Sequence, residues 1–340
     1  EMSIHLIVIS IKKLPSFDKN VIKKIITFRL RLTSMAKPFL KWAGGKRQLA
    51  EELITSLHPD FSKGSFRNYA EPFVGGGALM FELFEQNFID KAIICDFNEE
   101  LILVYKTIKA YAEELIVELK KLQIVYDGKT KSERREFYFE ERTKFRNEKN
   151  KINFSKQSKK WIDRAKWFIF FNKTGFNGLY RVNQKGEFNV PPSDMGNKDL
   201  VQEANLLEVQ KVLQNVTILS GDYQQCFDYL SKDWFVYFDP PYRPLKPTSF
   251  TTYSSHNWND DSEQIRLANF CQKIGDDKKV KLMVSNSDPS AIDSSDNFFE
   301  KWYPTCKGFV ITPISAIRAI NSNGKDRGPI SELLIQNYLD

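Results

Sequence analysis

Short apolar runs and amphipathic helical patterns alternate along most of the chain. Two apolar runs each lead into a helical pattern, and these four segments are Asn68–Phe73, Ala78–Asn87, Lys91–Asn98 and Glu99–Leu115. Three later apolar runs predict strands at Asn215–Tyr223, Asp233–Tyr242 and Lys281–Asp288. Strands that alternate with helices are typical of an α/β domain with a parallel sheet.

A segment of different character interrupts this pattern. Residues 116–172 are charged, predicted to be helical and interleaved with aromatic residues. In Gly178–Pro192, two short alternating runs flank Asn183–Gly186, which predicts a β-hairpin because glycine readily adopts a positive φ. Insertions into such sheets usually leave at the carboxyl ends of strands, where ligands also bind. We therefore expect an α/β domain formed by residues 35–105 and 210–340, with an inserted domain at 106–209.

Composition excludes several classes of protein. No apolar run among the 340 residues approaches the roughly 20 residues that a membrane span needs. Four scattered cysteines without a C-x-x-C pair, together with three histidines, favour neither a zinc site nor a disulfide scaffold. We therefore expect a soluble cytoplasmic protein with reduced cysteines and no metal.

Charge is spread unevenly along the chain. Residues 120–190 hold 19 Lys/Arg and 8 Asp/Glu, a local net charge of +11 in a chain whose total is +7. This block indicates either a surface that binds a polyanion or a solvated helical surface with internal ion pairs, and charge alone does not choose. Residues 1–34 are also basic and precede Met35–Pro38, which resembles a natural start. We expect 1–34 to be a dispensable or poorly ordered extension.

Two motifs point to chemistry at the ends of predicted strands. The first is EPFVGGGAL at Glu71–Leu79, a glycine-rich turn between a strand and a helix, with Asp96 ending the next strand. A glycine run followed by a spaced acid is typical of sites for nucleotide-like cofactors, although a simple turn and a capping aspartate remain an alternative. Neither this run nor WAGGKRQ, which begins at Trp42, matches the spacing of a dinucleotide fingerprint or a P-loop.

The second motif, DPPY at Asp239–Tyr242, is the more specific. The two prolines fix the backbone and lack N–H donors, so Asp239 and the Pro240 carbonyl can accept from an exocyclic amino group. Tyr242 offers a ring on which a base can stack. Methyl transfer from a sulfonium to an amino nitrogen requires this orientation rather than a strong base. The alternative interpretation is a proline-ended strand with a surface tyrosine.

These and other motifs resemble the Dam-type, α-group DNA adenine-N6 methyltransferases, which include the GATC-methylating partners of restriction endonucleases. The resemblance spans about residues 37–338. In order, it is carried by FLKWAGGK from 39, EPFVGGGAL, DFNEEL from 96, FNKTGFNGLYRVNQKGEFNVP from 171, FDPPY, SFTTY from 249 and the segment 316–338. It implies a Rossmann-like sheet with an inserted helical and β-hairpin target-recognition domain. Residues 116–165 match the family only loosely.

The resemblance also implies S-adenosylmethionine as methyl donor and double-stranded DNA as partner, with single-stranded DNA as an alternative. Positions that match the family's cofactor site are Trp42, Lys46, Phe73, Gly75, Asp96, Asp222 and Asp239. The catalytic tetrad matches Asp239, Pro240, Pro241 and Tyr242. Positions that match DNA contacts are Lys41, Phe176, Asn177, Leu179, Arg181 and Pro191. Among these, Arg181 matches a reader of guanine, while Phe176 and Leu179 could instead simply pack the base of the hairpin.

Two other functions remain open from the sequence. Because DPPY is shared among amino-methyltransferases, an alternative is an adenine or cytosine amino-methyltransferase that acts on RNA or on a DNA site other than GATC. A DNA-binding protein that kept the fold and lost catalysis is a further alternative, against which Lys46, Asp96, Asp239 and Tyr242 all argue. The resemblance favours a role beside a cognate restriction endonuclease, not necessarily in physical contact with it.

Overall fold

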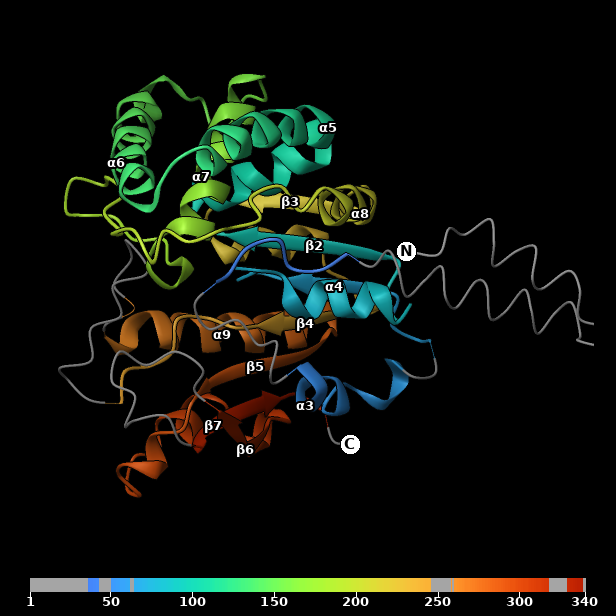
Figure 1. The fold of residues 1–340 in the computed structure, drawn as a ribbon. Helices are drawn as coiled ribbons and strands as arrows, with labels where there is room; N and C mark the ends of the chain where they lie inside the picture. The colour runs from blue at the N-terminus through green and yellow to red at the C-terminus, as the bar shows by residue number, and fades with distance from the viewer. Residues whose placement is uncertain are drawn as a thin grey trace, which may run out of the picture. The chain divides into compact units, whose positions relative to one another are not determined.

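A seven-stranded sheet forms the centre of the computed structural model (Figure 1). Its strands are β1 (Asn68–Glu71), β2 (Lys91–Asp96), β3 (Val216–Ser220), β4 (Trp234–Phe238), β5 (Lys281–Ser287), β6 (Val310–Ile317) and β7 (Pro329–Gln336). They lie in the order β3-β2-β1-β4-β5-β7-β6. Strands β1 to β5 are parallel to one another, and β7 is antiparallel to both β5 and β6. The predicted α/β fold is confirmed, and the sheet is Rossmann-like.

The structure describes residues 36–42, 50–61, 64–245, 258, 260–317 and 329–338. The expectation for residues 1–34, the cofactor position Lys46, the SFTTY motif and part of the closing segment 316–338 lie outside these described residues. Within the described ranges, no helix combines the length and the apolar content required to cross a membrane.

Both faces of the sheet are buried, because successive side chains of each strand point to opposite sides. In β4, for example, Phe235 and Tyr237 pack into the hydrophobic core on one face, whereas Val236 and Phe238 pack into a second core on the other. All four are at most 1% exposed. This explains why the strands appear in the sequence as continuous apolar runs.

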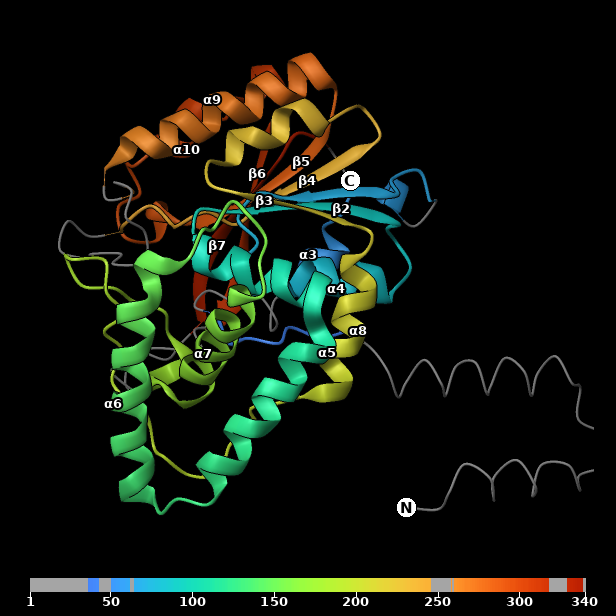
Figure 2. The ribbon, with the colours of Figure 1, turned by 90° about the horizontal axis from the view of Figure 1, so that it is seen from above.

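Helices cover the two faces (Figure 2). On one side lie α3 (Ala50–Thr55), α4 (Ala78–Glu85), α8 (Glu203–Leu213) and the beginning of α5 (Glu99–Asp127), and on the other lie α9 (Asp261–Lys278) and α10 (Phe298–Trp302). Short 3-10 helices complete the connections at Pro59–Phe61, Lys149–Lys151, Phe176–Gly178, Tyr223–Tyr229, Pro289–Ala291 and Thr305–Lys307. The layers are those expected of a parallel sheet with crossover helices.

The helix predicted to end at Leu115 continues as α5 to Asp127, with non-helical dihedrals at Tyr111. It is followed by α6 (Lys131–Glu148), which begins with a capping box formed by Thr130 and Glu133, and by α7 (Lys160–Thr174). Figure 2 shows α6, α7 and the distal part of α5 lying together beyond the sheet. Residue 106, where we place the beginning of the inserted domain, lies inside α5, five residues before the kink at Tyr111.

The predicted hairpin at 178–192 is present as a turn whose arms are not regular strands. The Gly186 N–H donates to Asn183 O at 2.9 Å, and Gly186 has a φ of 72°. A single antiparallel bridge joins Val182 to Phe188. The sequence therefore predicted the turn correctly, and the structure shortens the pairing on either side of it.

Candidate active site

Three acidic side chains lie at the carboxyl ends of adjacent parallel strands. Glu71 is the last residue of β1, Asp96 is the last residue of β2, and Asp239 directly follows β4. Because β1 pairs in parallel with both β2 and β4, the three carboxyl groups share one edge of the sheet. This is the edge at which ligands bind in open α/β sheets.

Burial changes the protonation of two of these acids. It raises the pKa of Glu71 to about 8; the Tyr69 hydroxyl, which donates to Glu71 Oε2 at 3.1 Å, opposes this shift, and the nearby charge of Asp239 adds to it. Burial likewise raises the pKa of Asp96 to about 6, against the effect of two backbone N–H donors. At pH 7 Glu71 is therefore mainly neutral and Asp96 mainly ionised.

The glycine turn after β1 is fixed to Asp96. The Gly75 N–H donates to Asp96 Oδ2 at 3.1 Å, the Asn98 N–H donates to Asp96 Oδ1 at 2.8 Å, and the Tyr105 hydroxyl donates to Gly75 O at 3.0 Å. Gly75 has a φ of 46°, and a Cβ at this position would lie 2.6 Å from Trp42 Cδ1. Only glycine fits here, because a side chain would meet both backbone strain and the indole.

The other predicted cofactor positions surround the same turn. Phe73 packs against Tyr223, with ring centroids 5.2 Å apart, and against Trp258 at 5.6 Å. Asp222, which follows β3, accepts from the Gln224 N–H at 2.9 Å and pairs with Arg266 at 2.7 Å. The structure thus brings Trp42, Phe73, Gly75, Asp96 and Asp222 to neighbouring strand ends, whereas Lys46 lies outside the described residues.

This arrangement fits an adenosine-containing group such as S-adenosylmethionine. Asp96 offers an acidic acceptor at the end of β2, and the adjacent Phe97 is 43% exposed, so that a flat apolar ring stands beside the carboxylate. The Tyr223 hydroxyl is buried without a hydrogen-bond partner among the described residues, which leaves one donor for a polar ligand. In the part of the chain that the structure describes, no cluster of three or more His, Cys, Asp or Glu residues could hold a metal.

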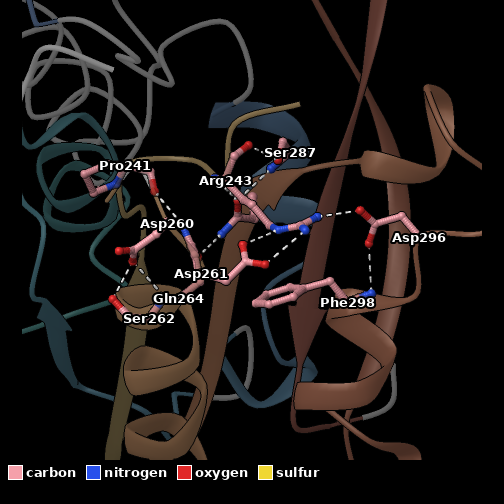
Figure 3. Close-up of polar contacts among 10 residues, drawn as sticks. Pro241, Arg243, Asp260, Asp261, Ser262, Gln264, Ser287, Asp296 and Phe298 are labelled. Atoms are coloured by element: carbon pink, nitrogen blue, oxygen red, sulfur yellow. Dashed lines mark hydrogen bonds and ion pairs between the residues drawn. The ribbon is translucent and has the colours of Figure 1, made fainter. Parts of the chain in front are cut away.

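The DPPY tetrad leaves β4 toward the same edge, and Figure 3 shows the contacts of Pro241 and of Arg243, which directly follows the tetrad. Pro240 is buried, whereas Asp239 and Tyr242 are half-buried. The Tyr242 hydroxyl donates to Glu332 Oε2, on β7, at 2.8 Å. Burial raises the pKa of Tyr242 well above its usual value, and the charges of Asp239 and Glu332 act in the same direction, so Tyr242 is a neutral phenol at physiological pH.

The predicted DNA-contacting residues gather around the end of α7. Phe176 and Asn177 are exposed, Asn177 has a φ of 54°, and the Phe176 N–H donates to Pro191 O at 2.9 Å. Leu179 is half-buried against the core, as the packing alternative expected. Arg181 is exposed, and its Nε donates to Asn189 Oδ1 at 2.8 Å, so its guanidinium is oriented before any DNA is present.

Asn172 connects Lys41 to this turn. The Lys41 N–H donates to Asn172 Oδ1 at 2.8 Å, and Asn172 Nδ2 donates to both Lys41 O and Gly178 O at 2.7 Å. Sequence reasoning missed Asn172, and also Glu71, Gln264, Asn286 and Glu332. All five are at most 8% exposed. For four of them the one available signal was a polar residue within an apolar or motif segment, whereas Gln264 lies in the polar beginning of α9 and had no such signal.

Sheet order, acidic edge, glycine turn and DPPY tetrad together define the class of S-adenosylmethionine-dependent amino-methyltransferases with a Rossmann-like sheet. The sequence profile of the D12 class N6 adenine-specific DNA methyltransferases matches residues 42–320, and the chain belongs to this family. The predicted membership among Dam-type adenine methyltransferases is therefore confirmed, and so is the predicted enzyme class, adenine-specific DNA methyltransferase.

Individual relatives agree with the family. The chain is 45% identical over 304 residues to the type II methyltransferase M.MjaIII of Methanocaldococcus jannaschii, which covers 89% of this chain and 99% of that protein. It is 36% identical to the type II methyltransferase M1.LlaDCHI of Lactococcus lactis subsp. cremoris, over 89% and 95% of the two chains. It is 30% identical to the DNA adenine methylase of Escherichia coli (strain K12), over 88% and 94%.

Proposed function

We propose that this enzyme methylates N6 of adenine within GATC and that it is the modification enzyme of a restriction–modification system. The choice of DNA site rests on the segment 176–181, which follows α7. Arg181 is exposed there and bonded to Asn189, and Phe176 and Asn177 are exposed as well. Because the bond to Asn189 is made by Nε of Arg181, its two terminal nitrogens suit bidentate bonding to guanine O6 and N7. The type II names of two relatives support the second part of the proposal.

We propose that Trp42, Lys46, Phe73, Gly75, Asp96, Asp222 and Asp239 hold the methyl donor. S-adenosylmethionine, when bound, supplies a methyl group on a positively charged sulfur. The Asp96 carboxylate would accept from ribose hydroxyls, since its two N–H donors fix its plane and leave acceptor capacity. Trp42 and Phe73 supply apolar surface on either side of the glycine turn.

In the catalytic tetrad, Asp239 and the Pro240 carbonyl would accept from the amino group of the target adenine. These two bonds turn the nitrogen lone pair toward the methyl group, and the rate gain is one of proximity and orientation. Tyr242 would stack on the adenine after it leaves the duplex. Pro241 completes the rigid turn, because the ring of each proline fixes its φ.

We assign the DNA contacts to Lys41, Phe176, Asn177, Leu179, Arg181 and Pro191. Phe176 is 48% exposed and suits a wedge beside an unstacked base. We assign these roles to a target-recognition domain at 106–209, inserted into a catalytic domain formed by 35–105 and 210–340. Lys41 belongs to the catalytic part by sequence and is joined to the turn through Asn172.

A plasmid protection assay tests the site and the activity together. Plasmid DNA from a host without adenine methylation is incubated with the enzyme and S-adenosylmethionine, then digested with a GATC nuclease that adenine methylation blocks and, separately, with one that requires it. We expect protection from the first and cutting by the second. Asp239→Ala is the control, and it should lose both effects while DNA binding largely survives.

Labelled methyl transfer distinguishes the alternative substrates, which are RNA and DNA sites other than GATC. If neither digestion changes although the cofactor binds, the GATC assignment is wrong, and transfer of labelled methyl to random-sequence DNA and to RNA shows which substrate is used. A cognate endonuclease would cut the same sequence, and cutting by such an enzyme should stop at sites that this methyltransferase has modified.

A further inference from the structure

The two peptide groups that flank Tyr242 are both held by buried side-chain amides (Figure 3). On the preceding side, Gln264 Nε2, from α9, donates to Pro241 O at 2.9 Å. On the following side, the Arg243 N–H donates to Asn286 Oδ1, from β5, at 2.9 Å. The backbone on each side of the tyrosine is therefore attached to a different element of the sheet domain.

The two amides are also bonded to each other. Asn286 Nδ2 donates to Gln264 Oε1 at 3.0 Å, and the two side chains are 1% and 2% exposed. An unbroken chain of hydrogen bonds thus runs from Pro241 O through Gln264 and Asn286 to the Arg243 N–H. A buried amide network in which each member is satisfied is rigid, because any rotation leaves a buried polar group unpaired.

This chain restrains the dihedrals that the prolines leave free. The rings of Pro240 and Pro241 fix their φ angles, so the direction of the Tyr242 ring depends on ψ of Pro241 and on φ and ψ of Tyr242 itself. The orientation of Pro241 O is set by ψ of Pro241, and the orientation of the Arg243 N–H is set by ψ of Tyr242. Gln264 and Asn286 therefore act at the rotations that aim the ring.

The segment after Tyr242 is anchored independently. The Arg243 guanidinium pairs with Asp261 and Asp296, each at 2.6 Å, and lies over the Phe298 ring at 4.3 Å. Ser287 Oγ donates to Arg243 O at 2.7 Å. With residue 243 held by these groups, we expect a change at Gln264 to act on Tyr242.

We propose that Gln264 and Asn286 are positioning residues for methyl transfer, and that they fix the backbone of Tyr242 so that its ring meets the extruded adenine in the reactive geometry. The inference rests on the proposed role of Tyr242 as the stacking surface. Both side chains are buried and bond to the backbone on either side of Tyr242, so we expect their removal to act on the rate of transfer and not on binding.

The test compares two glutamines of the same helix. Gln264→Met removes the donor to Pro241 O, and the matched control Gln272→Met removes an equivalent bond from Gln272 Nε2 to Trp302 O, at 2.7 Å, away from the tetrad. Methyl transfer is measured with labelled S-adenosylmethionine and saturating unmethylated genomic DNA, which contains every short site. We expect Gln264→Met to lower kcat at least about tenfold, since small displacements of a reacting group are costly. Its KM for the cofactor and its Kd for DNA should stay within about threefold, and Gln272→Met should stay near wild type in all three quantities.

Two outcomes would overturn the inference. One is an equal kcat for Gln264→Met and Gln272→Met; the other is a loss confined to KM or Kd. Tyr242→Ala separates this from the proposed function: if it transfers methyl at the wild-type rate, the stacking role itself is wrong. If Gln264→Met does not fold, Gln264→Asn replaces it, because it keeps a neutral amide but shortens the side chain by one methylene, which takes the donor away from Pro241 O, and the same division between kcat and binding is expected.

Discussion

At the scale of single residues, the site depends on carboxyl groups whose environments differ. Glu71 is 4% exposed and mainly neutral at pH 7, whereas Asp96, with two N–H donors, is mainly ionised. A neutral Glu71 avoids a third negative charge, in addition to those of Asp96 and Asp239, at the edge where the methyl donor would bind. The motif predicted the position of Asp96, but the protonation of both acids depends on burial and therefore on the folded structure.

Binding of the methyl donor should depend on the protonation of Asp96. Burial raises the pKa of Asp96 from 3.8 to about 6, so below pH 6 the group is protonated and loses an acceptor for the ribose. We expect affinity for S-adenosylmethionine to fall roughly tenfold per pH unit below 6, measured by calorimetry from pH 5 to 8. Asp96→Asn should bind weakly with no such dependence. An unchanged affinity between pH 5 and 7 would contradict this role.

The same shift has a stability consequence of defined sign. Between pH 3.8 and about 6 the folded protein binds more protons at Asp96 than the unfolded chain does. The contribution of Asp96 to the free energy of unfolding is therefore most favourable below pH 3.8, and it is lost as pH rises through 6. The burial that shapes the site thus costs stability at neutral pH.

At the scale of elements, a buried ion pair joins the first turn of α5 to α7. Arg164 Nε donates to Glu100 Oε2 at 2.8 Å, and both side chains are 2% exposed. The Arg164 guanidinium also lies 3.5 Å from the centre of the Phe145 ring and donates to Phe145 O. Because α5 begins only three residues after Asp96, this pair connects the cofactor edge to the inserted helices.

Removing one partner of the Arg164–Glu100 pair should lower the free energy of unfolding. Arg164→Met leaves Glu100 buried without its cation, and we expect a loss of about 3–5 kcal/mol in the free energy of unfolding, measured with urea. The double substitution Arg164→Met with Glu100→Gln should recover a large part of it, since no charge is then buried. The control, Lys211→Met, breaks a pair whose lysine is 70% exposed and should cost under about 1 kcal/mol. Equal losses for the single and double variants would contradict the explanation.

At the scale of the whole molecule, most of the net positive charge lies in the inserted segment. Residues 120–190 carry a net charge of +11 in a chain of +7, so the rest of the chain does not supply a general attraction for DNA. Some of these cations have structural partners, such as Arg142 and Arg146, which donate to the hairpin carbonyls Val190 O and Phe188 O at 3.2 and 2.8 Å. The interpretation as a helical surface with internal partners thus applies to these two arginines, and DNA binding by the other cations of residues 120–190 stays a prediction.

DNA binding should therefore weaken steeply with salt. If about four phosphates are neutralised, raising the salt from 50 to 200 mM should lower the affinity roughly 100-fold, because counterions are released from the DNA on binding. Fluorescence anisotropy of a labelled duplex measures this directly. Affinity for S-adenosylmethionine, measured in the same buffers, is the control and should change little. A salt-independent DNA affinity would place the contacts outside this basic segment.

The sequence by itself determined the class of fold, the positions of five strands and the motifs of the site. These are local signals: apolar runs mark strands buried on both faces, and DPPY and the glycine turn are fixed by backbone requirements within a few residues. Only the tertiary structure decided the sheet order, which places Glu71, Asp96 and Asp239 on adjacent strands. It also decided the contact of Gln264 with Pro241 of the tetrad and the contact of Asn286 with Arg243, the residue after the tetrad, which span 23 and 43 residues of sequence. Such contacts arise from the packing of distant elements, and no periodicity along the chain encodes them.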